Sequence, residues 1–404
     1  MSSLTQAGPG AGTRAPRRPR LVSTPLALTF MAEFTSLTSF LLLISVLPMR
    51  VAAAGASSAA AGLITAALLA GTVIAEAAAA FAIRRLGYRV VLAAGAVLLG
   101  APTLALLPRE PQAIMVAVSF VRGLGFGLCG VATGALTALL LPPERRGEGL
   151  GLLGIVSGVP AIVALPAGAW LAGHHQATVA AAVAMIAGLM PLAALRWLPG
   201  GRPGSPMSGG PVTSSRGALR LPLVFAACTV AAGVIDSFLP LASAVPSSIC
   251  SAALLVQAIA ATISRWQAGR HGDRYGHARL LVPAIVVSAL GMAVMIWLAS
   301  PVAVLAGMVL FGAGFGVAEN STFALLIEQL PEAKASALWN LAYDAGYGLG
   351  PAMFGLFSAR TGYPAAFALT GVLVLAALPG ALRERKASVL PAAGRATGGV
   401  PALS

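Results

Sequence analysis

Long runs of apolar residues, each about 20 positions long, alternate along the chain with short polar segments. A helix of about 20 apolar residues crosses the hydrocarbon core of a bilayer, whereas membrane β-strands show segments of about 10 residues with alternating polarity. The pattern therefore predicts an all-α membrane protein with twelve transmembrane helices. The expected spans are 21–46, 58–83, 90–107, 113–139, 149–171, 178–197, 221–244, 247–266, 280–299, 302–326, 336–358 and 365–382.

The composition supports this class of protein. Of the 404 residues, 58% are hydrophobic and only 9% are charged, whereas soluble domains carry about 25% charged residues. The polar segments are too short to fold a catalytic domain, and they contain no Ser/His/Asp set, Walker loop or paired catalytic carboxylates. We therefore expect neither enzyme activity nor a cofactor.

Two polar segments at the start and in the middle of the chain define its organisation. Residues 1–20 are rich in Pro, Gly, Ser and Arg and predict a disordered tail, and the Gly/Pro/Ser-rich residues 199–220 predict a flexible linker. We expect a basic tail (1–20), an N-terminal six-helix bundle (21–198), the linker (199–220), a C-terminal six-helix bundle (221–383) and a second tail (384–404).

Lysine and arginine are distributed unevenly between the two sides of the predicted bundle. If the N-terminus is cytoplasmic, 22 of the 26 basic residues fall on the cytoplasmic side, three fall in outer loops and Arg122 lies within a span. This obeys the positive-inside rule, and attraction to anionic lipid headgroups explains the net charge of +14 without nucleic acid. We expect a multi-pass protein of the plasma membrane (the cytoplasmic membrane of a bacterium) with both termini cytoplasmic.

The two halves of the sequence repeat at an offset of 189 positions. Gly123–Gly127 matches Gly312–Gly316, and Leu141–Pro142 matches Leu330–Pro331. Because six spans separate the copies, both have the same orientation, which predicts two bundles related by a parallel pseudo-twofold axis along the membrane normal. Substrate sites of transporters built in this way lie near the midplane, between the halves.

One of the repeated segments also contains GxGxxG, from Gly125 to Gly130. A dinucleotide-binding motif of this type follows a β-strand in a soluble βαβ unit, and here it lies inside an apolar span. The glycines instead form small-xxx-small pairs, Gly123/Gly127 and Gly130/Gly134, echoed by Gly312/Gly316. We interpret them as positions where helices pack closely in lipid.

A loop motif gives a resemblance to a known family. The segment Gly269-Arg-His-Gly-Asp273-Arg274-Tyr-Gly276 resembles the loop signature of the major facilitator superfamily between spans 8 and 9, and the equivalent first-half loop keeps Arg85, Gly87 and Arg89. In that family the aspartate latches the outward-facing state against a helix N-terminus. The first-half loop has Arg84 at the aspartate position, so the resemblance implies that Asp273 carries the remaining latch.

The resemblance also implies a transport activity. Arg122-Gly-Leu-Gly125-Phe-Gly127 resembles the arginine and glycine pattern of span 4, and Gly154, Gly158 and Pro160 resemble the exporter pattern of span 5 without its adjacent Gly-Pro and final glycine pair. The chain is thus similar to the drug/proton antiporter-like exporters of the superfamily. A secondary transporter that works by alternating access is the implied function.

Ionisable residues inside the spans are candidates for the transport pathway because each costs roughly 2.5–3.5 kcal/mol to insert. Glu33 and Arg122 each lie about nine residues into a span, roughly 13–14 Å deep from opposite faces. A Glu33–Arg122 pair is therefore possible, either in proton or substrate handling or as a structural pair. Adjacent His174 and His175 and three isolated cysteines give no metal-ligand spacing, so we expect no metal site.

Further acids and amides complete the set of candidates. Asp344 in span 11 and Glu319 in span 10 are candidates for proton binding, with hydrogen-bonded structural acids as the alternative. Glu76 and Asp236 lie nearer the surfaces and are expected to serve as gate or structural acids. Polar contacts to substrate are expected from Gln257, Asn320 and Asn340.

These residues favour proton-coupled export of small organic or amphipathic compounds, with a proton symporter that imports a sugar or organic acid as the alternative. The expected partners are a small-molecule substrate, protons and membrane lipid, with no nucleic acid, and we expect a monomer. A membrane enzyme or receptor would need a catalytic constellation or a soluble domain, and the sequence contains neither.

Overall fold

The computed structural model describes residues 21–53, 58–106, 111–200, 219–239 and 245–389, and no β-strand occurs within these ranges. The predicted tail 1–20 and most of the predicted linker and C-terminal tail lie outside the described residues, so these expectations stay predictions. The second half ends in a helix that continues to Val389, beyond the expected boundary at 383.

The helices follow the predicted spans closely. Those of the first half are α1 (Thr24–Ala53), α2 (Ser58–Leu86), α3 (Tyr88–Gly100) with η1 (Ala101–Leu106), α4 (Gln112–Leu140), η2 (Pro143–Arg145), α5 (Arg146–Gly173), α6 (Ala177–Leu189), α7 (Pro191–Ala194) and η3 (Leu195–Trp197). Those of the second half are α9 (Arg220–Phe238), α10 (Ser247–Tyr275), α11 (Ala278–Val294) with η4 (Met295–Trp297), α12 (Pro301–Gln329), α13 (Glu332–Thr361), α14 (Tyr363–Leu375) and α15 (Leu378–Val389).

Eleven helical segments in the described ranges are long and apolar enough to cross a membrane. The remaining predicted span, 336–358, falls on α13, which has 30 residues. This helix is not among the eleven, because charged and polar residues such as Lys334, Asn340 and Asp344 interrupt its apolar sequence. The protein is therefore an all-helical membrane protein.

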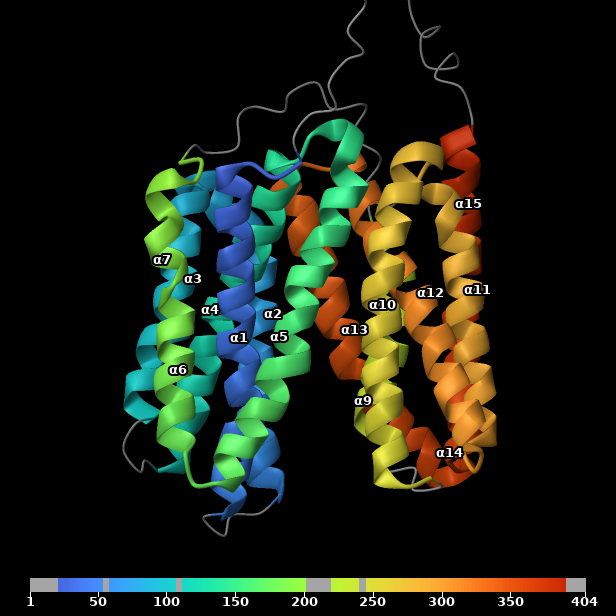
Figure 1. Cartoon of the computed structure of the whole chain (residues 1–404), viewed down its shortest axis with the longest axis horizontal. Helices are drawn as coiled ribbons and strands as arrows, with labels where there is room; N and C mark the ends of the chain where they lie inside the picture. The colour runs from blue at the N-terminus through green and yellow to red at the C-terminus, as the bar shows by residue number, and fades with distance from the viewer. Residues whose placement is uncertain (1–20, 54–57, 107–110, 201–218, 240–244, 390–404) are drawn as a thin grey trace, which may run out of the picture.

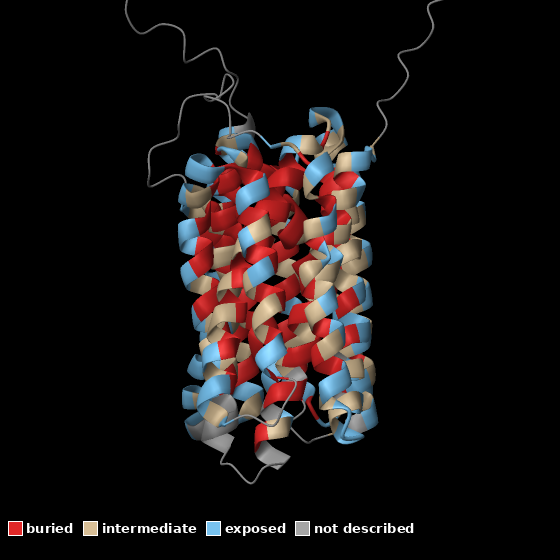
Figure 2. Cartoon of the chain, turned by 90° about the vertical axis from the view of Figure 1, so that its left-hand side faces the viewer, coloured by how far each residue is buried: buried red, intermediate tan, exposed pale blue. Residues whose placement is uncertain are grey.

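The described helices form two groups, α1–α7 and α9–α15, which stand side by side in Figure 1 with α13 between them. The groups meet where α5 packs against α10 and α12, and where α13 packs against α2 and α4. Figure 2 shows buried residues behind the outer helices that face the viewer, and the exposed residues of those helices on the outside. In each group, two pairs of helices pack closely in corresponding ways: α2 and α3 against α4, and α10 and α11 against α12.

The repeat seen in the sequence reappears in the closest of these contacts. A Cβ atom added to Gly123 of α4 would overlap the backbone oxygen of Leu68, and one added to Gly312 of α12 would overlap that of Gln257. Both partners, like both glycines, are 189 positions apart. Gly127 and Gly316 make equivalent approaches to α2 and α10, and Gly125 packs equally closely on Leu99 of α3. Gly125 and Gly127 of the GxGxxG segment are therefore packing residues, as predicted, whereas Gly130 makes only an ordinary contact, with Asn340.

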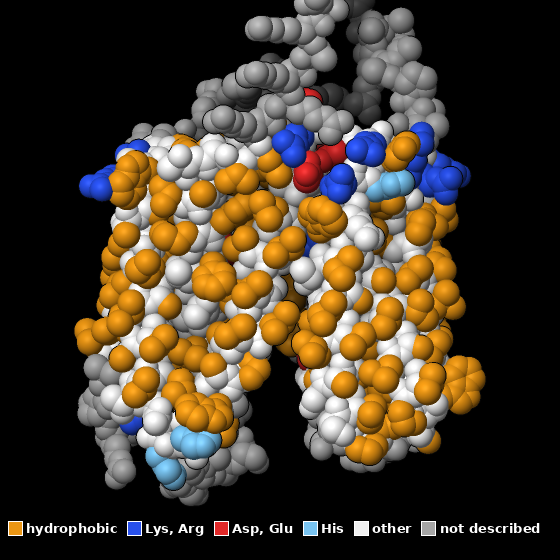
Figure 3. Space-filling view, in the orientation of Figure 1, with side chains coloured by type: hydrophobic (Ala, Val, Ile, Leu, Met, Phe, Trp, Pro, Cys, Tyr) orange, Lys and Arg blue, Asp and Glu red, His pale blue; other side chains and the backbone are white. Residues whose placement is uncertain are grey.

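The surface has the distribution expected of a membrane protein. Hydrophobic side chains cover the flanks in Figure 3, and Lys and Arg side chains gather at the upper end, where the described helices α5, α10 and α11 begin or end. At the opposite end the space-filling view is hollowed between the two groups. The groups are thus joined at the basic end and separated at the other.

Candidate functional site

The carboxylate of Glu33 on α1 is held by two hydroxyl groups of neighbouring helices. Thr133 Oγ1 of α4 donates a hydrogen bond of 2.5 Å to Oε2, and Ser157 Oγ of α5 donates one of 3.2 Å to Oε1. Glu33 is half-buried. A carboxyl group that carries two hydrogen bonds at a contact of three helices is well positioned for proton or cation binding.

Arg265 of α10 is the basic group of this region, and the sequence analysis misplaced it. Arg265 is one of the 22 basic residues that were counted on the cytoplasmic side, because span 8 was expected to end one residue later, at 266. In the structure α10 continues to Tyr275 and Arg265 is buried. Its guanidinium Nη1 lies 3.3 Å from Glu319 Oε1 of α12. A buried charge needs a partner of opposite sign, and each of these two residues supplies one for the other.

The Arg265 side chain also touches the first half of the protein. A Cβ atom on Gly154 of α5 would overlap its Cδ atom, so the two helices meet at this side chain. Arg265 interacts electrostatically with Glu33 as well, and its guanidinium lies 5.7 Å from the centre of the Trp339 ring of α13. The charged cluster of Glu33, Arg265 and Glu319 therefore connects the two halves.

Aromatic residues extend from this cluster along α13. The ring of Trp339 lies 4.8 Å from that of Phe225 and 5.9 Å from that of Tyr343, and Tyr343 lies 6.0 Å from Tyr347. Tyr347 Oη donates a hydrogen bond of 3.0 Å to Asp236 Oδ2 of α9, whose residue is exposed. The row of rings thus leads from a buried ion pair to an exposed acid. Aromatic spacing of three to four residues on α13 was a usable signal that the sequence analysis missed.

The structure joins two of the predicted acids that were treated separately. Glu76 of α2 and Asp344 of α13 form a hydrogen bond between their side chains. Glu76 is 2% exposed, and Asp344 is half-buried. Glu76 is buried because α2 packs it against α13 and the close approach at Gly127 of α4. Its expected role as a gate or structural acid stays a prediction.

Arg122 has other partners than the predicted one. Its guanidinium donates hydrogen bonds to the backbone oxygens of Ser39 (2.8 Å) and Leu99 (3.1 Å), and the residue is fully buried. Glu33 instead binds Thr133, which is 11 residues farther along α4, or roughly 16 Å at the helical rise. The predicted Glu33–Arg122 pair does not form, since Arg122 lies level with Ser39 of α1.

The three candidate amides occupy different surroundings. Asn320 Nδ2 of α12 donates to the backbone oxygen of Gly147 at the start of α5, over 3.0 Å. Asn340 Nδ2 donates to the backbone oxygen of Ser336 on its own helix. Gln257 is half-buried on α10. Asn320 therefore contributes to the contact between the halves rather than to the space that separates them.

Asp273 of the loop motif contacts a helix N-terminus at the basic end, and this contact is called the Asp273 latch below. Asp273 accepts hydrogen bonds from the backbone nitrogens of Gly147 (2.7 Å, Oδ1) and Glu148 (2.9 Å, Oδ2), the first residues of α5. A carboxylate at a helix N-terminus satisfies free N–H groups and interacts favourably with the helix dipole. Because Asp273 belongs to α10, these bonds join the two halves.

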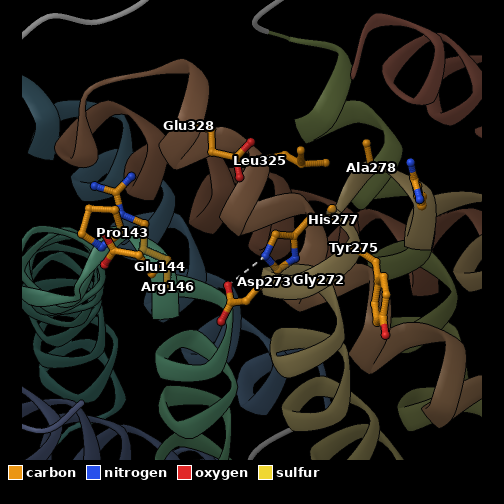
Figure 4. Close-up of a pocket in the computed structure, with 12 residues that line it drawn as sticks. Pro143, Glu144, Arg146, Gly272, Asp273, Tyr275, His277, Ala278, Leu325 and Glu328 are labelled. Atoms are coloured by element: carbon orange, nitrogen blue, oxygen red, sulfur yellow. Dashed lines mark ion pairs between the residues drawn. The ribbon is translucent and has the colours of Figure 1, made fainter. Parts of the chain in front are cut away.

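A pocket of about 370 Å³ surrounds this latch (Figure 4). Asp273 and His277 point toward each other there, with 3.5 Å between Oδ1 and Nε2. The pocket is also lined by Glu144, Arg146, Arg279 and Glu328.

The other motif residues shape the turns beside these contacts. Gly276 ends α10 with φ of +91° and Gly87 precedes α3 with φ of +85°, a left-handed conformation that favours glycine. Arg89 Nε donates to the backbone oxygen of Leu198 over 2.5 Å. In the described part of the chain, no group of three His, Cys, Asp or Glu residues could hold a metal ion.

A family model described as Major Facilitator Superfamily matches residues 29–337. The chain is similar in structure to FucP in its outward conformation, with a TM-score of 0.75 and 16% identity over 89% of this chain and 98% of that chain. It is also similar to a bacterial homologue of the iron transporter ferroportin in an outward-facing state, with a TM-score of 0.74 and 15% identity over 90% of this chain and 100% of that one.

A human protein has a similar structure as well. The organic anion transporter MFSD10 (TETRAN) matches with a TM-score of 0.72 and 15% identity, over 88% of this chain and 98% of that one. No curated protein matches the sequence significantly. At these identities the structural matches show the fold alone.

Proposed function

Because the chain belongs to the Major Facilitator Superfamily, we propose that it is a secondary active transporter that works by alternating access. The observation that carries the proposal is the arrangement of the contacts between its halves. The Asp273 latch and the Arg265 cluster join the halves toward the basic end, while the other end is hollowed (Figure 3). A transporter needs such a joint that closes on one side at a time.

The proposal includes twelve membrane spans in two bundles related by a parallel pseudo-twofold axis. The length of α13, 30 residues, supports it as the remaining span. Its polar residues Asn340 and Asp344 lie where α13 packs against α4 and α2 of the other half, and not toward lipid. Equivalent close contacts 189 positions apart, at Gly123 and Gly312, support the axis.

The basic end is proposed to be cytoplasmic, which places both termini inside and the hollow outside. The Lys and Arg side chains of this end in Figure 3 support this orientation through the positive-inside rule. The protein then resides in the plasma membrane, with its hollow open to the exterior. We further propose that it acts as a monomer, with only substrate, protons and lipid as partners.

We propose proton-coupled export of small organic or amphipathic compounds. Glu33, half-buried between three helices, and Asp344, half-buried beside Glu76, are the proposed proton acceptors, and Glu319 forms an ion pair with Arg265. In this cycle an acid takes a proton from outside as substrate leaves and releases it inside after the halves rock. For Arg122, the contacts within the first half favour the structural alternative.

The second candidate is a proton symporter that imports a sugar or organic acid. Arg265 favours it, since a guanidinium that interacts electrostatically with Glu33 and lies near the Trp339 ring could also pair with a substrate carboxylate. A solved structure of the same fold is the E. coli fucose:proton symporter FucP. Accumulation of labelled candidate compounds in intact cells distinguishes the two: export lowers it, and import raises it.

Everted membrane vesicles with an imposed ΔpH and a pH-sensitive dye test the coupling. Compounds that the protein exports should collapse the ΔpH, and Glu33→Gln should abolish this response while Glu144→Gln, a change at an exposed cytoplasmic acid, leaves it intact. Normal transport by Glu33→Gln would show that coupling does not run through Glu33. A thermal-shift screen across drugs, acids, sugars and amino acids supplies the candidate compounds.

A further inference from the structure

Two acids from opposite halves of the protein meet inside the membrane. Glu76 lies 10 residues before the end of α2, and Asp344 lies 12 residues after the start of α13, which puts both roughly 15–18 Å from the basic end. The hydrocarbon core is about 30 Å thick. The two carboxyl groups therefore form their hydrogen bond near mid-depth, at the contact of α2 with α13.

A hydrogen bond between two carboxyl groups requires a proton, because an ionised carboxylate only accepts. Two ionised carboxylates at hydrogen-bonding distance repel each other, and such pairs hold one proton between them. The second oxygen of Glu76, Oε2, is buried and has no hydrogen-bond partner in the described residues. An unpaired buried oxygen is far less costly on a neutral carboxyl than on a charged one, so Glu76 is the proton donor and Asp344 the acceptor.

The buried arginines of the region pair with residues other than these two acids. Within the described part of the chain, no lysine or arginine forms an ion pair with Glu76 or Asp344: Arg122 binds Ser39 and Leu99, and Arg265 binds Glu319. The helices that pack against α2 and α13 carry other ionisable groups: Glu33 and Arg50 on α1, Tyr88 and Arg89 on α3, Cys129 on α4, Arg220, Cys228 and Asp236 on α9, Glu328 on α12, and Tyr363 on α14. On the two helices themselves, Arg84 and Arg85 lie at the end of α2, and α13 carries Glu332, Lys334, Tyr343, Tyr347 and Arg360.

We infer that Glu76 and Asp344 form one shared-proton site, and that loss of its proton separates α2 from α13. With the proton, the pair is a hydrogen bond between the halves; without it, two negative charges face each other in the same place. The inference rests on the proposed transporter function, since a proton that joins two halves matters for a protein whose halves move. It adds to that function the residues and the contact through which protonation acts.

The distance between α2 and α13 at the basic end, measured between two spin labels, tests this inference. Arg84 near the end of α2 and Lys334 near the start of α13 are both exposed, and the three native cysteines are buried, so Arg84→Cys and Lys334→Cys can be spin-labelled selectively in nanodiscs. The labels should be close at low pH, and a long-distance population should grow as the pH rises. If opening releases one proton, the open-to-closed ratio changes by up to about tenfold per pH unit.

Two variants replace the shared proton by a permanent hydrogen-bond donor. In Glu76→Gln and in Asp344→Asn, an amide N–H donates to the remaining carboxylate at every pH, so the labels should stay close throughout. Glu144→Gln is the matched control, because it changes an exposed acid outside this contact and should keep the response of the unsubstituted protein. Using both variants protects the test against the failure of one to fold.

The inference is overturned if the label distance of the unsubstituted protein does not depend on pH, or if both variants respond as it does. The vesicle assay is independent of this outcome. If compounds are transported but the label distance does not depend on pH, the shared-proton site is wrong and the proposed transporter function still stands. A pH response lost in both variants, without transport of any compound, would support the site and contradict the proposed function.

Discussion

Replacing Asp273 by alanine should open the basic end of the molecule. The change removes two hydrogen bonds from a half-buried carboxylate to the N-terminus of α5, of 2.7 and 2.9 Å. A hydrogen bond to a charged group contributes about 1.5–3 kcal/mol, and the two share one carboxylate, so we expect a loss of about 3 kcal/mol in the contact between the halves. Since 1.4 kcal/mol corresponds to a factor of ten, the closed-to-open ratio should fall by roughly 100-fold or more.

A shift of this size is easy to detect. A population that is roughly 99:1 closed would become about half open. The same spin labels at Arg84 and Lys334 report it at fixed pH, as a second, longer distance. Asp273→Asn should have a smaller effect, because its amide oxygen still accepts one of the two bonds while its amide nitrogen cannot accept the other.

Glu144→Ala is the control for this prediction. It removes an exposed acid from the same pocket, and Glu144 makes no ion pair with the start of α5 among the described contacts. A long-distance population that stays within threefold of the unsubstituted value in Asp273→Ala would refute the reasoning. The latch would then be a contact that the closed state tolerates but does not need.

Three further substitutions test the packing and the buried charges. Gly269→Ala should weaken the contact of α10 with α5, because the added Cβ would overlap a backbone oxygen of α5; a label distance unchanged from the parent contradicts this. Arg122→Ala should lower the thermal unfolding temperature in detergent far more than Arg84→Ala, because it empties a fully buried site and removes the hydrogen bonds of Arg122. The expected loss of stability is about 3 kcal/mol or more, and equal decreases in the two variants would contradict this prediction. Arg265→Gln should destabilise the protein by about 3–5 kcal/mol, because it leaves Glu319 unpaired. Adding Glu319→Gln should restore part of this loss, whereas strictly additive losses would contradict an ion pair between the two residues.

The sequence predicted the latch and the helix packing at the level of residues. Asp273 meets the start of α5 as the motif implied, and Gly123 and Gly312 are close-contact positions as their spacing indicated. Both predictions concern short local patterns. A helix N-terminus has free N–H groups in any fold, and a glycine allows close approach wherever a second helix packs on it.

The buried charges were predicted less well. Arg122 and Glu33 were placed at a similar depth, but the structure puts Arg122 opposite Ser39, six residues along α1 from Glu33. Arg265 was counted with the cytoplasmic loop because its span was expected to end at residue 266, whereas α10 continues to Tyr275, about two and a half turns farther. An error of six residues displaces a side chain by roughly 9 Å along a helix, enough to assign it the wrong partner.

The sequence by itself determined that this chain is an all-helical membrane protein with a repeated organisation, because long apolar runs are stable only as helices in lipid and because a repeat in sequence is visible without coordinates. Only the tertiary structure decided which charges meet: Glu76 with Asp344, Arg265 with Glu319, and Glu33 with Thr133 and Ser157. The reason is geometric. A helix directs successive side chains around a full circle, so their partners depend on how each helix is rotated and shifted against its neighbours, and that is fixed by the packing of the whole bundle.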